Sequence, residues 1–370
     1  MGRVDLDGEI VRRILVGSWR QEPAAVSFSE EELTRALPRL RGSGAGSLTW
    51  WRIRKTSLSS TKSASELLQT YKYNTLISAV REAEIVNAFV KFREHGIEPL
   101  LIKGWSAARP YPEPGLRPYG DIDLVVRNQD LEKAEAVRQS FGDKKFSIDL
   151  DHSEITTLDH RTVDEFFERS TLAPLNGTTI RVLSPEDHLR VIAIHTLKHG
   201  VWRPLWLCDI AAAVEKRPSD FDWEYCLGKD TRQRRWVLSA IRIANELLQA
   251  NISGTPATTT KELPWWLKPT ILKEWAAPYS AKQEYNRHEA PMMSYLRKPA
   301  GLIRDLKNRW PNPIAATIDL GGQINALPRL PFQLGNCFLR TARFVMNLPK
   351  ALGRPEKTVS SESASTKPAV

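Results

Sequence analysis

The strongest helical pattern in the chain lies between residues 65 and 95. Apolar residues recur there at intervals of three and four positions, as they do along one face of an α-helix. His95-Gly96 ends the pattern, because glycine suits the left-handed position that follows many helices. Weaker helical patterns occupy residues 1–40, before a Gly/Ser-rich break at residues 41–47.

Short strand patterns follow this helix. Residues 99–102 and 121–126 are apolar runs that predict buried strands, and residues 145–151 alternate as a third strand would. A helix is predicted over residues 129–141. The Asn176-Gly177 pair between two β-like runs predicts a hairpin turn, because both residues tolerate positive φ.

From Ser184 onward the pattern becomes helical. Ser184-Pro-Glu-Asp187 combines a capping serine, a proline in the first position and acids in the first turn, which is typical of a helix start. Helices are predicted to continue to about residue 352. We therefore predict an α+β fold, in which helices flank a small mixed sheet of about four or five strands and the C-terminal half is largely helical.

Composition is that of a globular protein, with 41% hydrophobic and 26% charged residues among 370. No run approaches the ~20 apolar residues of a membrane span. The N-terminus has acids where a signal peptide would be basic, so we expect a cytoplasmic protein. The three cysteines are far apart in the sequence, which disfavours a disulfide framework or a zinc knuckle.

The charge balance narrows the class of partner. The formal net charge is +10, which favours polyanions such as nucleotides, nucleic acid or a membrane surface. Nucleic acid is a partner that this charge allows but does not require.

Two aspartates carry the candidate chemistry. In a strand over residues 121–126, Asp121 and Asp123 point to the same side, because alternate side chains share a face. Neighbouring carboxylates repel each other unless a cation lies between them, and Mg²⁺ or Mn²⁺ prefers such oxygen ligands together with phosphates. This arrangement supports phosphoryl or nucleotidyl transfer. The next predicted strand offers Asp149 and Asp151, either of which would complete a three-carboxylate site.

A candidate phosphate-binding turn precedes the pair. Gly104 would let the backbone approach a phosphate closely, and Ser106 is a candidate cap of a short helix there. Lys103 and Arg117 would neutralise phosphate charge.

Seven short motifs follow one another along the chain. They read Ile102-Lys103-Gly104, Arg117-Pro118, Asp121-Ile122-Asp123-Leu124, Asp149-Leu150-Asp151, Ser184-Pro-Glu-Asp187, His195-Thr-Leu-Lys-His199-Gly200 and Trp206-Leu-Cys-Asp209. This order resembles the bacterial family of uncharacterised nucleotidyltransferases (nucleotidyltransferase family 5), within the superfamily typified by DNA polymerase beta. The resemblance covers about residues 70 to 250 and extends weakly to both ends.

The patterns and the resemblance together divide the chain into four parts. We expect an N-terminal helical segment over residues 1–64, a nucleotidyltransferase core over 65–183, a helical region over 184–355 and a Ser/Thr/Lys-rich, disordered tail over 356–370. The resemblance also implies an activity. The implied reaction moves a nucleoside monophosphate from a nucleoside triphosphate such as ATP to an unidentified small molecule, peptide or protein.

The resemblance also assigns roles to residues. Asp121 and Asp123 would hold Mg²⁺ and act in catalysis, with Asp149 as the third metal ligand or general base. The nucleotide phosphates would be bound by Lys103, Gly104, Ser106 and Arg117. We favour Asp149 over Asp151 because it matches the family residue and lies between apolar neighbours.

Two departures from the family pattern keep other functions open. Trp105 stands where the superfamily has a second Gly or Ser, and Asp151 stands where a His is usual. These departures motivate one alternative, a catalytically weak protein that only binds a nucleotide or a partner. The net charge of +10 suggests another, a nucleic-acid-modifying enzyme.

Two histidines admit more than one interpretation. His195 and His199 share a helix face at a spacing that can hold zinc, but no third ligand is evident, so a structural or substrate-lining role is favoured. Asp209 is a candidate for orienting one of these imidazoles.

Overall fold

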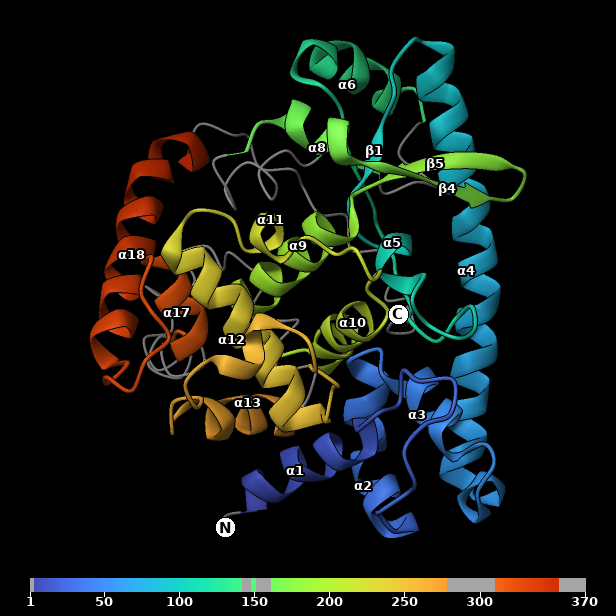
Figure 1. The fold of residues 1–370 in the computed structure, drawn as a ribbon, viewed down its shortest axis with the longest axis vertical. Coiled ribbons are helices and arrows are strands. Elements are labelled where there is room, and N and C mark those ends of the chain that lie inside the picture. Colours follow the sequence, from blue (N-terminus) through green and yellow to red (C-terminus); the bar gives the residue numbers. More distant parts are fainter. Residues whose placement is uncertain (1–2, 142–147, 151–160, 278–309, 353–370) are drawn as a thin grey trace.

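The computed structural model describes residues 3–141, 148–150, 161–277 and 310–352, and every structural statement below refers to them (Figure 1). The predicted disordered tail and Asp151 lie outside the described residues.

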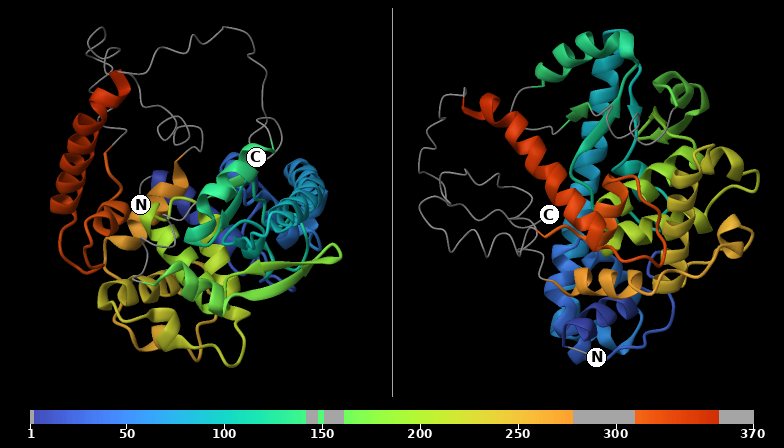
Figure 2. Two further views of the ribbon diagram at one scale, coloured as in Figure 1. Left: turned by 90° about the horizontal axis from the view of Figure 1, so that it is seen from above. Right: turned by 90° about the vertical axis from the view of Figure 1, so that its left-hand side faces the viewer.

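One long helix runs along a side of the molecule. This helix, α4 (Lys62–Glu94), confirms the prediction made for residues 65–95, and the side chain of Thr61 caps its start by accepting from the Ala64 N–H. Shorter elements precede it: α1 (Arg3–Leu15), α2 (Glu30–Gly42), α3 (Gly46–Ile53) and a 3₁₀ turn (Ser57–Ser60). Figures 1 and 2 show α4 on the side of the molecule opposite the C-terminal helix α18 (Leu330–Leu352).

Five short strands form one mixed sheet in the order β3-β2-β1-β5-β4, which confirms the predicted size and type of sheet. The pairs β1–β2 and β4–β5 are antiparallel, whereas β1–β5 and β2–β3 are parallel. The strands are β1 (Leu100–Leu101), β2 (Ile122–Val125), β3 (Ile148–Leu150), β4 (Thr171–Leu175) and β5 (Thr178–Val182).

The predicted hairpin joins the last two strands. Asn176 and Gly177 both have positive φ, 45° and 82°, as the tight turn between β4 and β5 requires. Three short helices lie between or beside the strands: α5 (Trp105–Ala108), α6 (Leu131–Gln139), which follows a 3₁₀ turn (Asn128–Asp130), and α8 (Val163–Arg169).

The two faces of the sheet pack against different partners. Ile122, Leu124 and Ile148 belong to a core that the sheet shares with α4 and α6. Leu100 and Val125 point the other way, into a larger core shared with the helical half. Because side chains alternate along a strand, the aspartates of β2 and β3 face that helical half.

The C-terminal half is largely helical, as predicted. Ser184 caps its first helix by accepting from the Asp187 N–H at 3.2 Å, with Pro185 in the first position. The helices are α9 (Pro185–Lys198), α10 (Pro204–Glu215), α11 (Trp223–Leu227), α12 (Thr231–Leu248), a 3₁₀ turn (Pro256–Thr259), α13 (Leu267–Ala276), α17 (Pro313–Asp319) and α18.

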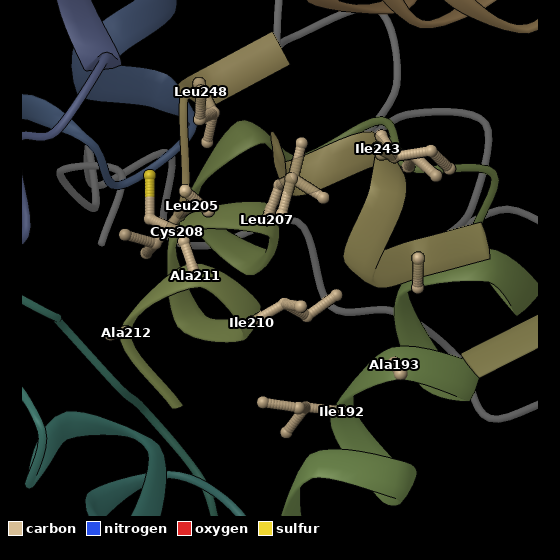
Figure 3. Close-up of a cluster of buried hydrophobic side chains, with 14 of the residues drawn as sticks. Ile192, Ala193, Leu205, Leu207, Cys208, Ile210, Ala211, Ala212, Ile243 and Leu248 are labelled. Atoms are coloured by element: carbon tan, nitrogen blue, oxygen red, sulfur yellow. The ribbon is translucent and has the colours of Figure 1, made fainter. Parts of the chain in front are cut away.

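The larger core extends from α1 to α17. Figure 3 shows its centre, where buried side chains of α9, α10 and α12 meet, among them Ile192, Cys208 and Ile243. Because α1 packs on α13, the N-terminal segment and the helical half share this core. None of the described helices is both long enough and apolar enough to cross a membrane.

Candidate active site

The turn after β1 requires glycine. Gly104 has a φ of +62°, a conformation that strains residues with a Cβ. A Cβ at this position would also lie 3.1 Å from the backbone oxygen of Asp121. Glycine therefore allows the turn to lie directly against the residue that precedes β2. This closeness brings Lys103 to the aspartate pair, with Nζ 4.0 Å from Oδ1 of Asp123.

The three candidate aspartates lie at one edge of the sheet. Asp121 and Asp123 line the same cavity, as their predicted shared face requires. Asp149 is paired with Asp123 in the parallel register of β2 and β3. Paired residues of adjacent strands lie on the same face, about 4.8 Å apart. Asp149 is exposed to solvent, whereas Asp123 is largely covered.

These three carboxylates do not converge on a single metal-binding position in the described residues. Among the described residues, no three His, Cys, Asp or Glu side chains converge as a metal site would require. The donor set nevertheless fits Mg²⁺, because this ion keeps several waters and takes one or two carboxylates together with substrate phosphates. Asp121 and Asp123 supply two hard oxygen donors in one cavity, next to the cationic Lys103.

The cavity lies between the sheet core and the helical half and has a volume of about 420 Å³. That volume is in the range of small-ligand sites. One wall is the turn and strand that carry Lys103, Gly104, Asp121 and Asp123. The opposite wall comes from α9 and α10, and its residues are Ile192, His195, Thr196, Arg203, Trp206 and Asp209.

Arg117 lines this cavity, but its guanidinium forms an ion pair with the carboxylate of Asp209. Its Nη2 donates to Oδ2 of Asp209 at 2.8 Å, and its Nε lies 3.2 Å from both oxygens of that carboxylate. The hydroxyl of Tyr111 donates to the same carboxylate at 2.7 Å. Burial alone would lower the pKa of Arg117, but the Asp209 charge and hydrogen bonds outweigh burial and raise it. Arg117 therefore stays cationic and holds the loop before β2 onto α10.

Ser106 does not cap the short helix. The cap position of α5 is Gly104, and Ser106 is the second helical residue. Its buried hydroxyl instead donates to the Leu101 carbonyl at 3.4 Å. The prediction of a serine cap was wrong, because the cap position is Gly104 and the helix starts two residues earlier than a Ser106 cap would place it. The side chain of Trp105 is buried and packs in the core that the sheet shares with α4 and α6.

The two histidines of α9 form an aromatic cluster with Trp206. The ring centroids of His195 and His199 are 4.5 Å apart, and His195 meets Trp206 edge-on at 4.9 Å. Trp202 meets Trp206 at 5.3 Å. His195 and Trp206 line the cavity, and the substrate-lining role of His195 stays a prediction.

Sequence patterns missed other residues of this region. Ile192 and Thr196 lie on the same face of α9 as His195, so the spacing of that helix could have found them. Arg203 is contributed by the loop before α10, and no pattern pointed to it. The hydrogen bonds from Arg117 and Tyr111 give Asp209 a role that the Trp-x-x-Asp motif did not suggest.

His188 lies one helical turn before Ile192 and is buried. Both of its ring nitrogens lack a hydrogen-bond partner in the described structure. Burial lowers the pKa of His188 to about 4, with Arg117 and Arg109 adding to the effect and Asp209 opposing it. The imidazole is therefore neutral at physiological pH.

A family model described as uncharacterised nucleotidyltransferase matches residues 30–249, which is more than half of the chain. The match includes the turn, all five strands and both helices that form the opposite wall of the cavity. The search of curated proteins and the search of solved structures each returned no match.

Proposed function

We propose, from the premise that the chain belongs to the family of uncharacterised nucleotidyltransferases, that it transfers a nucleoside monophosphate from a nucleoside triphosphate to an acceptor. The observation that carries the proposal is the shared cavity, in which Asp121 and Asp123 lie against the Lys103-Gly104 turn. The cavity combines oxygen donors for a metal with a cation for phosphate, which are the two requirements of such a reaction.

The proposed reaction is a displacement at the α-phosphorus. An oxygen of the acceptor forms a bond to that phosphorus, and the bond from the α-phosphorus to the oxygen bridging to the β-phosphate breaks. Pyrophosphate leaves with the bonding electron pair, and the acceptor hydroxyl loses its proton to a base. Asp149 is proposed as this base, because it is paired with Asp123 in the register of β2 and β3 and is exposed, so that an acceptor can approach it.

Asp121 and Asp123 are the residues that would hold Mg²⁺ or Mn²⁺. The ion, when bound, would neutralise charge on the phosphates and stabilise the leaving pyrophosphate. Lys103 would bind a phosphate oxygen, since its ammonium lies beside the same carboxylate. Gly104 lines the cavity and has no side chain of its own, so a phosphate is proposed to approach the backbone of this turn.

Arg117 has a different proposed role from the other cations. Its guanidinium is bonded to Asp209, so a phosphate would have to compete with a buried carboxylate. Its proposed contribution is therefore to hold the loop that leads into β2. Ser106 is proposed to act in the same indirect way, through its bond to Leu101.

The test is nucleotidyl transfer with each α-labelled nucleoside triphosphate and Mg²⁺, supplied with cell extract as the source of acceptors. Label should move to an acceptor with release of pyrophosphate. The Asp123→Asn variant should lose this transfer, because it keeps the shape and removes the charge. Glu132→Gln removes an exposed carboxylate of α6 and serves as the control. Equal transfer by wild type and the Asp123 variant would overturn the proposal.

A second candidate function is supported by the net charge of +10. The acceptor, or a bound partner, would then be nucleic acid. Binding of labelled RNA or DNA should weaken steeply as salt rises, because counterions are released on binding. Affinity that does not change with salt would remove this candidate.

A further inference from the structure

We infer that the wall of the cavity formed by α9 and α10 is the binding site for the nucleobase of the donor, with Trp206 as its stacking surface. The inference rests on the proposed function and deepens it. It assigns the ring-shaped end of the substrate to one wall and the phosphate end to the other.

The two walls of the cavity differ in chemistry. The wall from the sheet carries Lys103, Asp121 and Asp123, which suit phosphates and a cation. The opposite wall carries the rings of His195 and Trp206. A nucleoside triphosphate has the same division, with a polyanion at one end and a flat ring at the other. The cavity therefore presents to each end of the molecule the side chains that bind it.

Aromatic rings concentrate on this wall. Trp206 is in contact with three other rings, those of His195, His199 and Trp202, at centroid distances of 4.9, 5.3 and 5.3 Å. His195 meets it at 77° between ring planes, so the two rings do not stack face to face. Trp206 is only half-buried. A planar base is the ligand that a half-buried indole at a cavity wall binds well.

The wall is held rigidly, as a stacking surface should be. Nε of Arg203 donates to the Ser43 carbonyl at 2.7 Å, and its guanidinium lies 5.8 Å from the Trp206 ring. The Thr196 hydroxyl donates to the Ile192 carbonyl at 2.7 Å, so it is occupied within the helix. The inferred interaction of the base with this wall is stacking on the indole of Trp206. We therefore expect purine donors to bind more tightly than pyrimidine donors, because their rings are larger.

The test compares a ligand that has a base with one that lacks it. Binding of ATP and of inorganic tripolyphosphate, each with Mg²⁺, is measured calorimetrically for wild type, Trp206→Ala and Trp206→Phe. Trp265→Ala is the matched control, since Trp265 is 74% exposed and does not line the cavity. Circular dichroism checks that each variant is folded.

Trp206→Ala should weaken ATP binding by roughly fivefold or more, which is the lower end of the effect of losing one base stack. Tripolyphosphate binding should stay at the wild-type value, and Trp206→Phe should restore most of the ATP affinity because it keeps a ring. Unchanged ATP affinity in Trp206→Ala would overturn the inference and leave the proposed function standing. Failure of wild type to bind either ligand would overturn both, whereas the predicted pattern without any transfer would support the base site and count against turnover.

Discussion

The carboxylate of Asp209 on α10 holds the guanidinium of Arg117 in a buried ion pair, with 2.8 Å between Nη2 and Oδ2. Arg117 lies four residues before Asp121, in the irregular loop that leads into β2. The pair therefore ties the strand that carries the aspartates to the helix that carries Trp206. This buried ion pair therefore connects the two walls of the cavity.

Breaking this pair from one side should destabilise the protein strongly. In Arg117→Met the carboxylate of Asp209 stays buried and keeps the Tyr111 hydroxyl but loses its cation, which should lower the free energy of unfolding by about 3–5 kcal/mol. Urea unfolding followed by circular dichroism measures this change. Glu135→Gln, which breaks the exposed Arg138–Glu135 pair, should have little effect. Equal effects of the two variants would show that the buried pair does not hold the fold.

A side chain at position 104 should strain the turn after β1. Gly104→Ala combines a positive φ with a Cβ 3.1 Å from the Asp121 oxygen, so the turn or the residue before β2 must shift by a few tenths of an ångström. Gly177→Ala is a matched control, because Gly177 also has positive φ but nothing lies within 4 Å of its Cβ position. Each variant should lose about 1–2 kcal/mol of stability from backbone strain.

The activity of these two variants should differ. Only Gly104→Ala should also lower kcat/KM for the donor, by about tenfold or more, since it displaces Lys103 from the aspartates. The same kcat/KM in both variants would show that the turn does not position substrate.

The sequence predicted most of this sheet and one wall of the cavity. Alternation in residues 121–126 placed Asp121 and Asp123 on one face, and both line one cavity. The hairpin at Asn176 could be predicted because its turn is set by two adjacent residues. These features are local, so the residues that determine them are close in sequence.

The long-range contacts that complete the other wall could not be predicted in this way. Arg117 was expected to bind phosphate, but its partner Asp209 is 92 positions away in the chain, and no local pattern encodes that contact. The place of Arg203 in the cavity likewise depends on how the helical half packs against the sheet. Such long-range packing depends on how the shapes of distant side chains fit together, and the spacing of apolar residues along the chain does not specify that fit.

Asp149 has two candidate roles, general base and metal ligand, which a substitution can distinguish. If it is the base, Asp149→Asn should lower kcat by about 10²–10⁴-fold and leave the affinity for ATP and Mg²⁺ unchanged. Single-turnover kinetics and calorimetry give the two quantities. Glu132→Gln, an exposed carboxylate on α6, is the control. A large loss of ATP and Mg²⁺ affinity in Asp149→Asn would instead assign it as a metal ligand.

His188 should make stability depend on pH. Burial lowers its pKa from the ordinary value of 6.5 to about 4 in the folded protein, an effect to which Arg117 and Arg109 add and which Asp209 opposes. Between these two values the unfolded chain binds a proton that the folded protein does not. Stability contributed by the neutral imidazole is therefore fully present above pH 6.5 and is lost as pH falls toward 4.

The measurement is urea unfolding of wild type and His188→Leu at several pH values within that window. The free energy of unfolding of wild type should rise with pH more steeply than that of the variant, by up to about 1.4 kcal/mol per pH unit. Comparing slopes removes any constant loss of stability caused by the substitution, and subtracts the titration of carboxylates common to both proteins. His95→Gln, which removes an exposed histidine, should keep the wild-type slope. Parallel pH profiles for wild type and His188→Leu would show that the imidazole accepts its proton equally well in the folded and unfolded states.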